Sequence, residues 1–359
     1  VPTGGRRGRR GALLGGSRPG ARGVAALSPA VVALDVGGTA IRAALVTAEG
    51  RILHATSRPT VRGGRRDPHL AGTVAAAREM VDAAAELGVA VAGIGAGFPE
   101  YVAATGRLTS HEVLDWDAQP AALLAPLVPG RPVVVESDVR CAALAEARSG
   151  RGRGCGSFLY VSLGTGLSAA FVQDGRPWRG HRGEAIALGT FGVPPSVDAE
   201  STAAGIGGRH PGDDGPVPAA SGQPRPNDRR RSGKGRHPAT LEEHASGAGI
   251  AARYTLATGR AVTGARDVVR HAQAGDRTAT DVLRTAGQAL GTALGWVVAL
   301  LDPEAVILGG GLGTAGGVLH DALRKDYTAG CLRPPPPALH LAGLGTASGL
   351  LGAAILARE

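Results

Sequence analysis

An acidic residue and a glycine-rich turn lie between two apolar runs near the start of the chain, in LDVGGTAIRAALV at residues 34–46. Glycine lets a ligand approach the backbone closely, and the amides of consecutive turn residues form a concave site for an anion. We therefore predict that Gly37, Gly38 and Thr39 hold phosphate groups, with Asp35 beside them holding a hydrated cation. The alternative is an ordinary tight hairpin in which Asp35 only caps the turn.

The same pattern recurs in VSLGTGLSAAFV at residues 161–172, where Gly164, Thr165 and Gly166 form the turn. Each copy then reaches a second turn, EGR at 49–51 and DGR at 174–176. Two units of strand, glycine turn and strand predict a duplicated domain that closes on a nucleotide. The repetition favours phosphate binding over a plain hairpin for both turns.

Two further motifs carry chemistry but leave alternatives open. Asp138, in VVVESDVRCAALAE, stands where a β-branched run meets a helical one. It either caps the helix or accepts a proton from a hydroxyl that attacks a phosphoryl group. Gly309, Gly310 and Gly311 follow the apolar run at 305–308. Ligands commonly bind at the carboxyl end of such a strand, although a plain strand-to-helix turn has the same composition.

These motifs require strands and helices that alternate along the chain. Apolar periodicity predicts an α/β architecture, and 359 residues suffice for two domains. Strands are expected in 31–46, 51–58, 89–97, 131–136, 157–172 and 305–308, and helices at 69–88, 116–127, 141–148, 241–254, 265–274, 279–301 and 343–357.

The positive charge of the chain, +9 in total, belongs to two segments. Residues 1–30 carry six arginines and no acid, residues 201–240 carry seven cations against three aspartates, and the rest sums to −1. Both segments are rich in Gly and Pro and lack interleaved aromatic residues for base stacking. We therefore expect a disordered leader at 1–30 and a disordered insert at 191–238, without nucleic-acid contacts.

The cysteine content and the length of the apolar runs set further limits. Cys141, Cys155 and Cys331 are isolated and odd in number, which fits a reducing cytosol and argues against disulfides and a cysteine-rich zinc site. No apolar run is long enough to predict a transmembrane helix. We expect a cytoplasmic protein without a membrane partner.

Five ordered motifs resemble the ROK family of sugar kinases and repressors: LDVGGT, ESDVRCAALAE, SLGTG, LEEHASG and LDPEAVILGGG. The resemblance runs from about Val31 to the C-terminus, apart from the insert at 191–238. It implies duplicated actin-like/hexokinase (ribonuclease H-like) ATPase domains with an interdomain cleft, at residues 31–150 and 151–359. By analogy with the family, we also expect a homodimer.

The resemblance also implies roles for the motif residues. Asp138 falls on the family's catalytic base, and Glu242 falls on a glutamate that contacts sugar hydroxyls in the family's kinases. The cofactors implied are ATP and Mg²⁺, with Mg²⁺ held by Asp35 through water. The nucleotide side comprises two phosphate loops and an adenosine-binding turn: Gly37, Gly38, Thr39, Gly164, Thr165, Gly166, Gly309, Gly310 and Gly311.

The acceptor side departs from the family's pattern. Ser137 replaces the usual asparagine before the catalytic aspartate, and Glu112 replaces a sugar-contacting asparagine. Ala187 and Thr190 stand where the family's GExGH motif has its sugar-binding glutamate and its sugar- and zinc-binding histidine. Glu184, three positions upstream of Ala187, is a candidate replacement acid. The insert replaces the zinc cysteines, so no structural zinc is expected.

The leading hypothesis is an ATP-dependent, glucokinase-like enzyme that phosphorylates a hydroxyl of a sugar or sugar-like polyol. Its substrate residues would be Glu112, Ser137, Asp138, Glu184 and Glu242. The alternative is a non-catalytic sugar- or nucleotide-binding regulator without a DNA-binding domain, because only thirty Gly- and Arg-rich residues precede Val31. A third hypothesis is an ATPase that needs no sugar acceptor.

Overall fold

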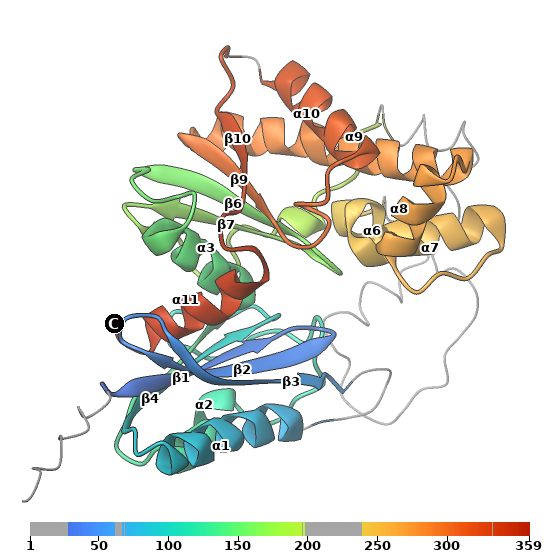
Figure 1. Cartoon of the computed structure of the whole chain (residues 1–359). Coiled ribbons are helices and arrows are strands. Elements are labelled where there is room, and N and C mark those ends of the chain that lie inside the picture. The colour runs from blue at the N-terminus through green and yellow to red at the C-terminus, as the bar shows by residue number, and fades with distance from the viewer. Residues whose placement is uncertain (1–27, 62–66, 68, 196, 198–238, 332) are drawn as a thin grey trace, which may run out of the picture.

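The computed structural model describes residues 28–61, 67, 69–195, 197, 239–331 and 333–359, which form two five-stranded mixed sheets (Figure 1). The first sheet has the order β3-β2-β1-β4-β5 and contains β1 (Ala30–Val36), β2 (Ala40–Thr47), β3 (Ile52–Pro59), β4 (Val91–Phe98) and β5 (Val133–Ser137). The second has the order β10-β9-β6-β7-β8 and contains β6 (Ser157–Leu163), β7 (Leu167–Gln173), β8 (Arg176–Pro177), β9 (Ala305–Gly309) and β10 (Ala338–Leu341). Each sheet joins an antiparallel hairpin with a glycine turn to parallel strands, so the predicted repetition is present.

The first sheet is covered on both faces, which explains the continuous apolar run in β1. Helices α1 (Ala71–Glu86) and α2 (Pro120–Leu124) pack on one face. Helices α3 (Asp138–Ser149) and α11 (Ser348–Leu356) pack on the other. Side chains of β1 therefore alternate between two apolar clusters, with Val32 and Leu34 in one and Val31 and Ala33 in the other.

The second sheet packs on a helical layer that includes α6 (Leu241–Ala245), α7 (Gly247–Thr258), α8 (Ala265–Gln273) and α9 (Arg277–Leu301). Asp276 caps the start of helix α9, because its side chain accepts the N–H of Ala279 at 3.1 Å, and the left-handed Asp302 follows the last residue of the helix. Its small residues let α10 (Val318–Gly330) approach closely, since a Cβ on Gly291 would lie 2.5 Å from the Leu323 carbonyl oxygen.

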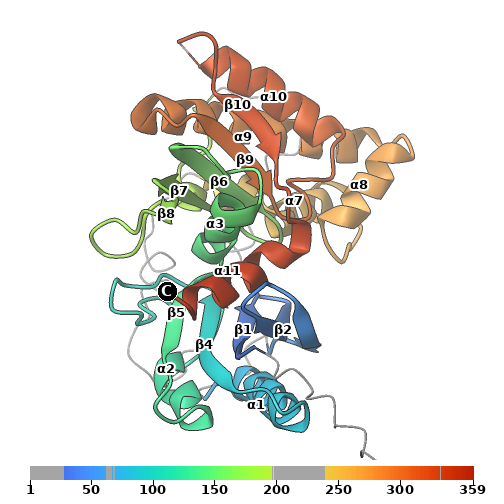
Figure 2. The same ribbon diagram turned by 60° about the vertical axis from the view of Figure 1, so that its left-hand side comes forward.

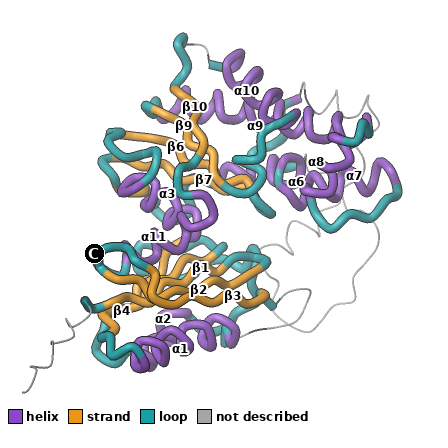
Figure 3. The backbone as a smooth tube through the Cα atoms, in the orientation of Figure 1, coloured by secondary structure: helices purple, strands orange, loops and turns teal. Residues whose placement is uncertain are grey.

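Helices α3 and α11 lie between the two sheets, as Figures 1 and 2 show from two sides. The backbone tube in Figure 3 makes the same layering visible by element type. Although α11 ends the chain, it packs on β1, β4 and α3, so the C-terminus returns to the first sheet. The division of the chain into domains at residue 150 stays a prediction. None of the described helices combines the length and apolar character needed to cross a bilayer.

Two predicted helices differ from the structure. The helix expected at 116–127 begins only at Pro120, with a short 3-10 turn at Ala125–Leu127, because the residue before a proline is disfavoured in helical conformation. The helix expected at 241–254 is broken at Ser246, which is extended and accepts the N–H of Gly249 at 3.1 Å as the cap of a new helix.

The end of the chain also differs from expectation. The predicted helix at 343–357 begins only at Ser348, because the N–H groups of Gly343 and Leu344 donate to the buried Glu146 carboxylate at 3.1 and 2.9 Å. Helix α10 and strand β10 were not predicted. Most of the expected leader at 1–30 and of the insert at 191–238 lies outside the described residues.

Candidate active site

The parallel strands of the first sheet bring the two predicted aspartates to one edge. Asp35 pairs with Gly97 across β1 and β4, and Phe98 pairs with Ser137 across β4 and β5. Asp138 follows Ser137 directly, and a Cβ on Gly97 would lie 3.3 Å from the Asp138 Cα. Asp35 and Asp138 therefore lie at the same sheet edge, where the carboxyl ends of the strands meet.

Ser137, not Asp138, caps helix α3. The Ser137 hydroxyl oxygen accepts the N–H of Arg140 at 3.4 Å, whereas Asp138 Oδ1 accepts the N–H of Val139 at 2.6 Å. Asp138 is thus the first residue of the helix, and the cap does not depend on it. The sequence leaves open whether Asp138 caps the helix, and in the structure Ser137 does so instead.

The surroundings of Asp138 suit it to proton transfer. Burial raises its pKa from the usual 3.8 to about 7, and the charges of Asp35 and Glu100 add to the rise. The Val139 N–H and the Arg140 guanidinium oppose it. A carboxyl group with a pKa near neutrality can gain and lose a proton at physiological pH, as a general base requires.

Asp35 lies where the first glycine turn meets the segment before α11. Arg42 Nη1 lies 3.1 Å from Asp35 Oδ2 and donates to the Thr346 carbonyl at 3.3 Å. A Cβ on Gly349 would lie 2.7 Å from Asp35 Oδ1, so the carboxylate contacts the first turn of α11. The pKa of Asp35 lies above its usual value, because the effect of burial outweighs the opposing effect of the neighbouring Arg42.

The donor set around Asp35 fits a hydrated Mg²⁺. Asp35 supplies one largely desolvated carboxylate at this edge, and a hydrated Mg²⁺ held there would offset the charge by which Asp35 raises the pKa of Asp138. Within the part of the chain that the structure describes, no group of three His, Cys, Asp or Glu residues could hold a metal ion. Mg²⁺ commonly binds through one or two carboxylates, water and substrate phosphates rather than in a cage of protein ligands, so a site centred on Asp35 suits its chemistry.

The first glycine turn is held by its own backbone and by Thr60. The Gly37 N–H donates to the Ala40 carbonyl at 2.9 Å, and the Thr60 hydroxyl donates to the Gly37 carbonyl at 2.6 Å. The Thr60 N–H also donates to the Thr39 carbonyl at 3.1 Å. These bonds occupy turn carbonyls, including those on both sides of Gly38.

The second glycine turn packs against the triglycine. The Leu163 carbonyl accepts the N–H of Leu312 at 3.0 Å and that of Gly313 at 3.1 Å, which joins the two motifs. Gly310 has a φ of 80°, and a Cβ there would lie 2.4 Å from the Leu163 carbonyl oxygen, so glycine is required. By contrast, a Cβ on Gly164 would meet no atom of the described residues within 4 Å, which leaves space for a ligand at the turn. The structure thus brings together the predicted set Gly164, Thr165, Gly166, Gly309, Gly310 and Gly311.

Glu242 lies beside this second turn. Its Oε1 accepts the N–H of Leu167 at 3.3 Å and would lie 2.8 Å from a Cβ on Gly166. Although the residue as a whole is exposed, desolvation of its carboxyl end raises the pKa of Glu242, and the charges of Glu112 and Glu243 raise it further. Glu112 and Glu242, far apart in the sequence, therefore act on one another electrostatically.

Glu100 is a site residue that sequence reasoning missed. It is 4% exposed, and its carboxylate accepts the Ser110 hydroxyl. The same carboxylate accepts the N–H of Glu112 at 2.7 Å, that of Val113 at 2.9 Å and that of Leu114 at 2.7 Å. Glu100 therefore shapes the loop that carries Glu112. The only sequence signal was its place two residues after the buried β4.

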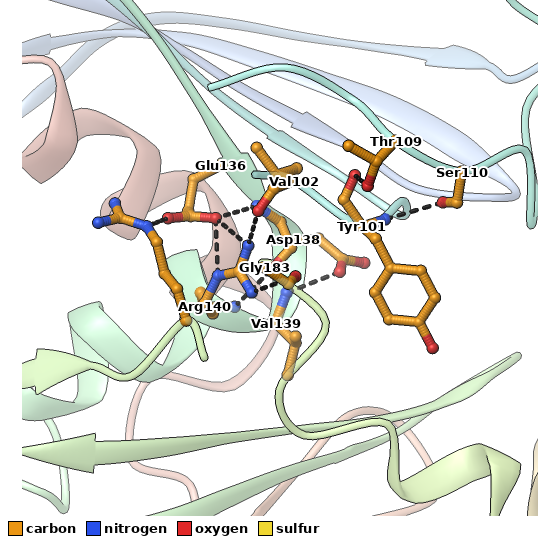
Figure 4. A network of polar contacts seen from close by, with 11 residues as sticks. Tyr101, Val102, Thr109, Ser110, Glu136, Asp138, Val139, Arg140 and Gly183 are labelled. Carbon is orange, nitrogen blue, oxygen red and sulfur yellow. Dashed lines mark hydrogen bonds and ion pairs between the residues drawn. The ribbon is translucent and has the colours of Figure 1, made fainter. Parts of the chain in front are cut away.

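A second missed group is the ion-pair network at the start of α3 (Figure 4). The Glu136 carboxylate accepts Arg140 Nε at 2.7 Å through one oxygen and Arg179 Nε at 2.7 Å through the other. Arg140 also donates to the carbonyls of Val102, at 2.7 Å, and Gly183, at 3.0 Å. Arg140 and Glu136 stand inside a motif that the sequence does single out, but the two carbonyls that Arg140 binds lie in distant loops.

The remaining acceptor-side residues lie in the segment after β8. Glu184 directly follows Gly183 and pairs with the exposed Arg182 at 2.8 Å. The Thr190 hydroxyl donates to the Ala187 carbonyl at 2.8 Å, in a 3-10 turn at Leu188–Thr190. Ala187 itself offers no side-chain donor or acceptor.

Comparison with known proteins relates this geometry to a family. The ROK family profile matches residues 31–359. A glucokinase from Streptomyces coelicolor is 30% identical over 337 residues, which cover 91% of this chain and 97% of that protein. The crystal structure of a ROK hexokinase from Thermus thermophilus has a TM-score of 0.68 at 30% identity, over 92% of this chain and 98% of that one. A ROK family glucokinase from Streptomyces griseus, in complex with glucose and AMPPNP, has a TM-score of 0.68 at 28% identity, over 92% and 99%. The predicted actin-like ATPase fold is confirmed, and the chain belongs to the ROK family.

Proposed function

We propose that this protein is an ATP-dependent sugar kinase that transfers the γ-phosphoryl group of ATP to a hydroxyl of a hexose. The observation that carries the proposal is the position of Asp138, a carboxyl group with a pKa near 7 at the sheet edge that also holds Asp35. Glucose is the first acceptor to test, because two of the matched relatives are named glucokinases.

Asp138 would act as the general base. Above about pH 7 its carboxylate accepts the proton of the acceptor hydroxyl, whose oxygen attacks the γ-phosphorus while the bond to ADP breaks. Asp35 would hold Mg²⁺ through water, and this ion would neutralise charge on the phosphates. The turn amides other than those of Gly37 and Gly164, which donate within their own turns, would bind phosphate oxygens. The triglycine would lie beside adenosine.

The acceptor would bind between loops of the two sheets. Glu112 and Glu184 stand on the loops after β4 and β8, and Glu242 lies beside the second turn. Their carboxylates accept hydrogen bonds from sugar hydroxyls. Ser137 would contribute indirectly, because its hydroxyl caps the helix that begins with Asp138.

The direct test is ATP consumption with a panel of hexoses, amino sugars and their N-acetyl forms. The proposal predicts ADP release and sugar phosphate formation that depend on one acceptor and on Mg²⁺. ADP release at equal rates with and without sugar would indicate the acceptor-independent ATPase instead.

A non-catalytic regulator is the second candidate, favoured by the apolar Ala187 and by Thr190, whose hydroxyl is bound to the backbone. Calorimetric titration with AMPPNP and Mg²⁺ separates the two functions. Nucleotide binding without turnover on every sugar of the panel would favour the regulator.

The proposal also covers the setting of the enzyme. It places the protein in the cytoplasm, in keeping with its use of ATP and its three free cysteines. A homodimer is proposed by analogy with the family, and no nucleic acid is needed for the reaction.

A further inference from the structure

We propose that Arg140 is a positioning residue that ties the acceptor-binding loops of the two sheets together beside Asp138. It does so through a latch formed by Val102, Arg140 and Gly183, called the Arg140 latch below. The inference rests on the proposed kinase function but concerns the geometry of the acceptor side alone.

The latch joins segments that belong to different sheets. Arg140 Nη2 donates to the carbonyl of Val102, in the segment after β4, at 2.7 Å. Its Nη1 donates to the carbonyl of Gly183, in the segment after β8, at 3.0 Å. In Figure 4 the guanidinium of Arg140 lies between these two segments and Glu136. One planar side chain therefore fixes the distance between the two loops.

Glu136 holds the guanidinium in place. Arg140 Nε lies 2.7 Å and Nη2 lies 2.6 Å from Glu136 Oε1, and the two side chains are 2% and 4% exposed. Arg179 donates to the other carboxylate oxygen, so Glu136 keeps one partner if Arg140 is replaced. A buried guanidinium with all of its nitrogens bonded has one orientation, which is what a positioning residue needs.

Gly183 shows that the two loops also touch directly. Its φ is 82°, and a Cβ there would lie 2.1 Å from the Val102 carbonyl oxygen. A side chain at this position would push the loops apart even with Arg140 intact. The close approach and the two hydrogen bonds are therefore two parts of one contact, which share the Val102 carbonyl.

The latch lies on the acceptor side of the proposed site. Glu184 directly follows Gly183, and Glu100, which shapes the loop bearing Glu112, lies two residues before Val102. Asp138 and Arg140 share the first turn of α3. The glycine turns proposed to bind the nucleotide contain none of the latch residues. Loss of the latch should therefore displace the sugar-binding loops and Asp138, and leave nucleotide binding intact.

The test compares Arg140→Met and Arg140→Lys with wild type and with a control, Arg148→Met. Arg148 is on the same helix and pairs with a glutamate, Glu359, but at the surface. We expect Arg140→Met to lower kcat/KM for the sugar by about 100-fold, as misplaced reacting groups do, with the Kd for AMPPNP changed by less than about twofold. Arg140→Lys should recover part of the loss because it keeps the charge, and Arg148→Met should match wild type.

A second variant tests the latch without touching the charge. Gly183→Ala should lower the same kcat/KM, and adding it to Arg140→Met should cost far less than the product of the two single effects, because both break one contact. Hydrogen exchange of residues 101–103 and 181–184 should rise in both variants. If Arg140→Met fails to fold, Arg140→Lys and Gly183→Ala carry the test.

Two results would overturn the inference: activity of Arg140→Met within about threefold of wild type, or AMPPNP binding weakened as much as kcat/KM. If wild type phosphorylates no sugar, the proposed function fails, and the latch is then judged by hydrogen exchange alone. Unchanged exchange at 101–103 and 181–184 in Arg140→Met would then refute it.

Discussion

At the scale of residues, the pKa of Asp138 ties the structure to a measurable rate. A base must be deprotonated to act, and burial holds this carboxyl at a pKa of about 7. We therefore expect log kcat/KM for the sugar to rise with pH up to about 7 and then level off. A pH–rate profile from pH 5 to 9 checks this. A plateau that persists down to pH 5 would contradict the raised pKa.

The same pKa shift predicts how Asp138 affects stability. Because the folded-state pKa lies above the unfolded value of 3.8, the charged carboxylate destabilises the fold increasingly from about pH 4 to pH 7. Asp138→Asn keeps an oxygen for the Val139 N–H and removes the charge. We expect it to raise the free energy of unfolding by about 1–3 kcal/mol at pH 8 and by less at pH 5. Urea unfolding at both pH values measures this, and an equal or reversed gain would contradict it.

A site residue can be predicted from the sequence when the residues that it works with stand next to it in the chain. The glycine turns and Asp138 stand in short contiguous motifs whose residue types indicate their chemistry. Glu100 acts through partners 10 to 14 residues away in its own loop. Besides the nearby Glu136, Arg140 acts through carbonyls 38 and 43 residues away, in loops that follow strands of different sheets. No local pattern marks such a pairing, so these two residues emerge only from the structure.

At the scale of elements, Ser137 has a structural role at the start of α3, which variants can distinguish from a role in substrate binding. As the N-cap residue it accepts the Arg140 N–H at 3.4 Å. Ser137→Ala should lower the free energy of unfolding by about 1 kcal/mol, and Ser137→Asn, which can also cap, should not. Ser149→Ala, at the exposed end of the same helix, is the control. A rise in the KM for the sugar without loss of stability would instead indicate direct contact with the substrate.

Most elements follow from apolar periodicity, and the exceptions have local causes. Ser246 divides a segment whose sequence predicts one helix, because its hydroxyl caps the start of α7. The next residue, Gly247, packs closely on the second glycine turn: a Cβ there would lie 2.5 Å from the Gly164 carbonyl oxygen. The start of α11 is delayed by bonds to Glu146, almost 200 residues earlier. Periodicity reports the burial of a face, and it carries no information on such distant partners.

At the scale of the whole molecule, α11 and α3 form the joint between the two sheets. A Cβ on Gly352 would lie 1.8 Å from the Cys141 carbonyl oxygen, so the two helices can cross only with glycine there. Gly352→Ala should lower the free energy of unfolding by about 1–3 kcal/mol through overpacking. Gly192→Ala, where a Cβ would meet no atom of the described residues within 4 Å, is the control. Equal melting temperatures for the two variants would contradict the close packing of this joint.

The role of Asp138 as the base of an ATP-dependent sugar phosphorylation can be measured in a single-turnover assay. Sugar phosphate formed from Mg²⁺, ATP and the preferred hexose is measured for wild type, for Asp138→Asn and for a control, Asp321→Asn, at an exposed position in the first turn of α10. The affinity for AMPPNP is measured on the same samples. We predict that Asp138→Asn loses at least about 100-fold in rate, with unchanged nucleotide affinity and an active control. Turnover by Asp138→Asn at the wild-type rate would contradict the account.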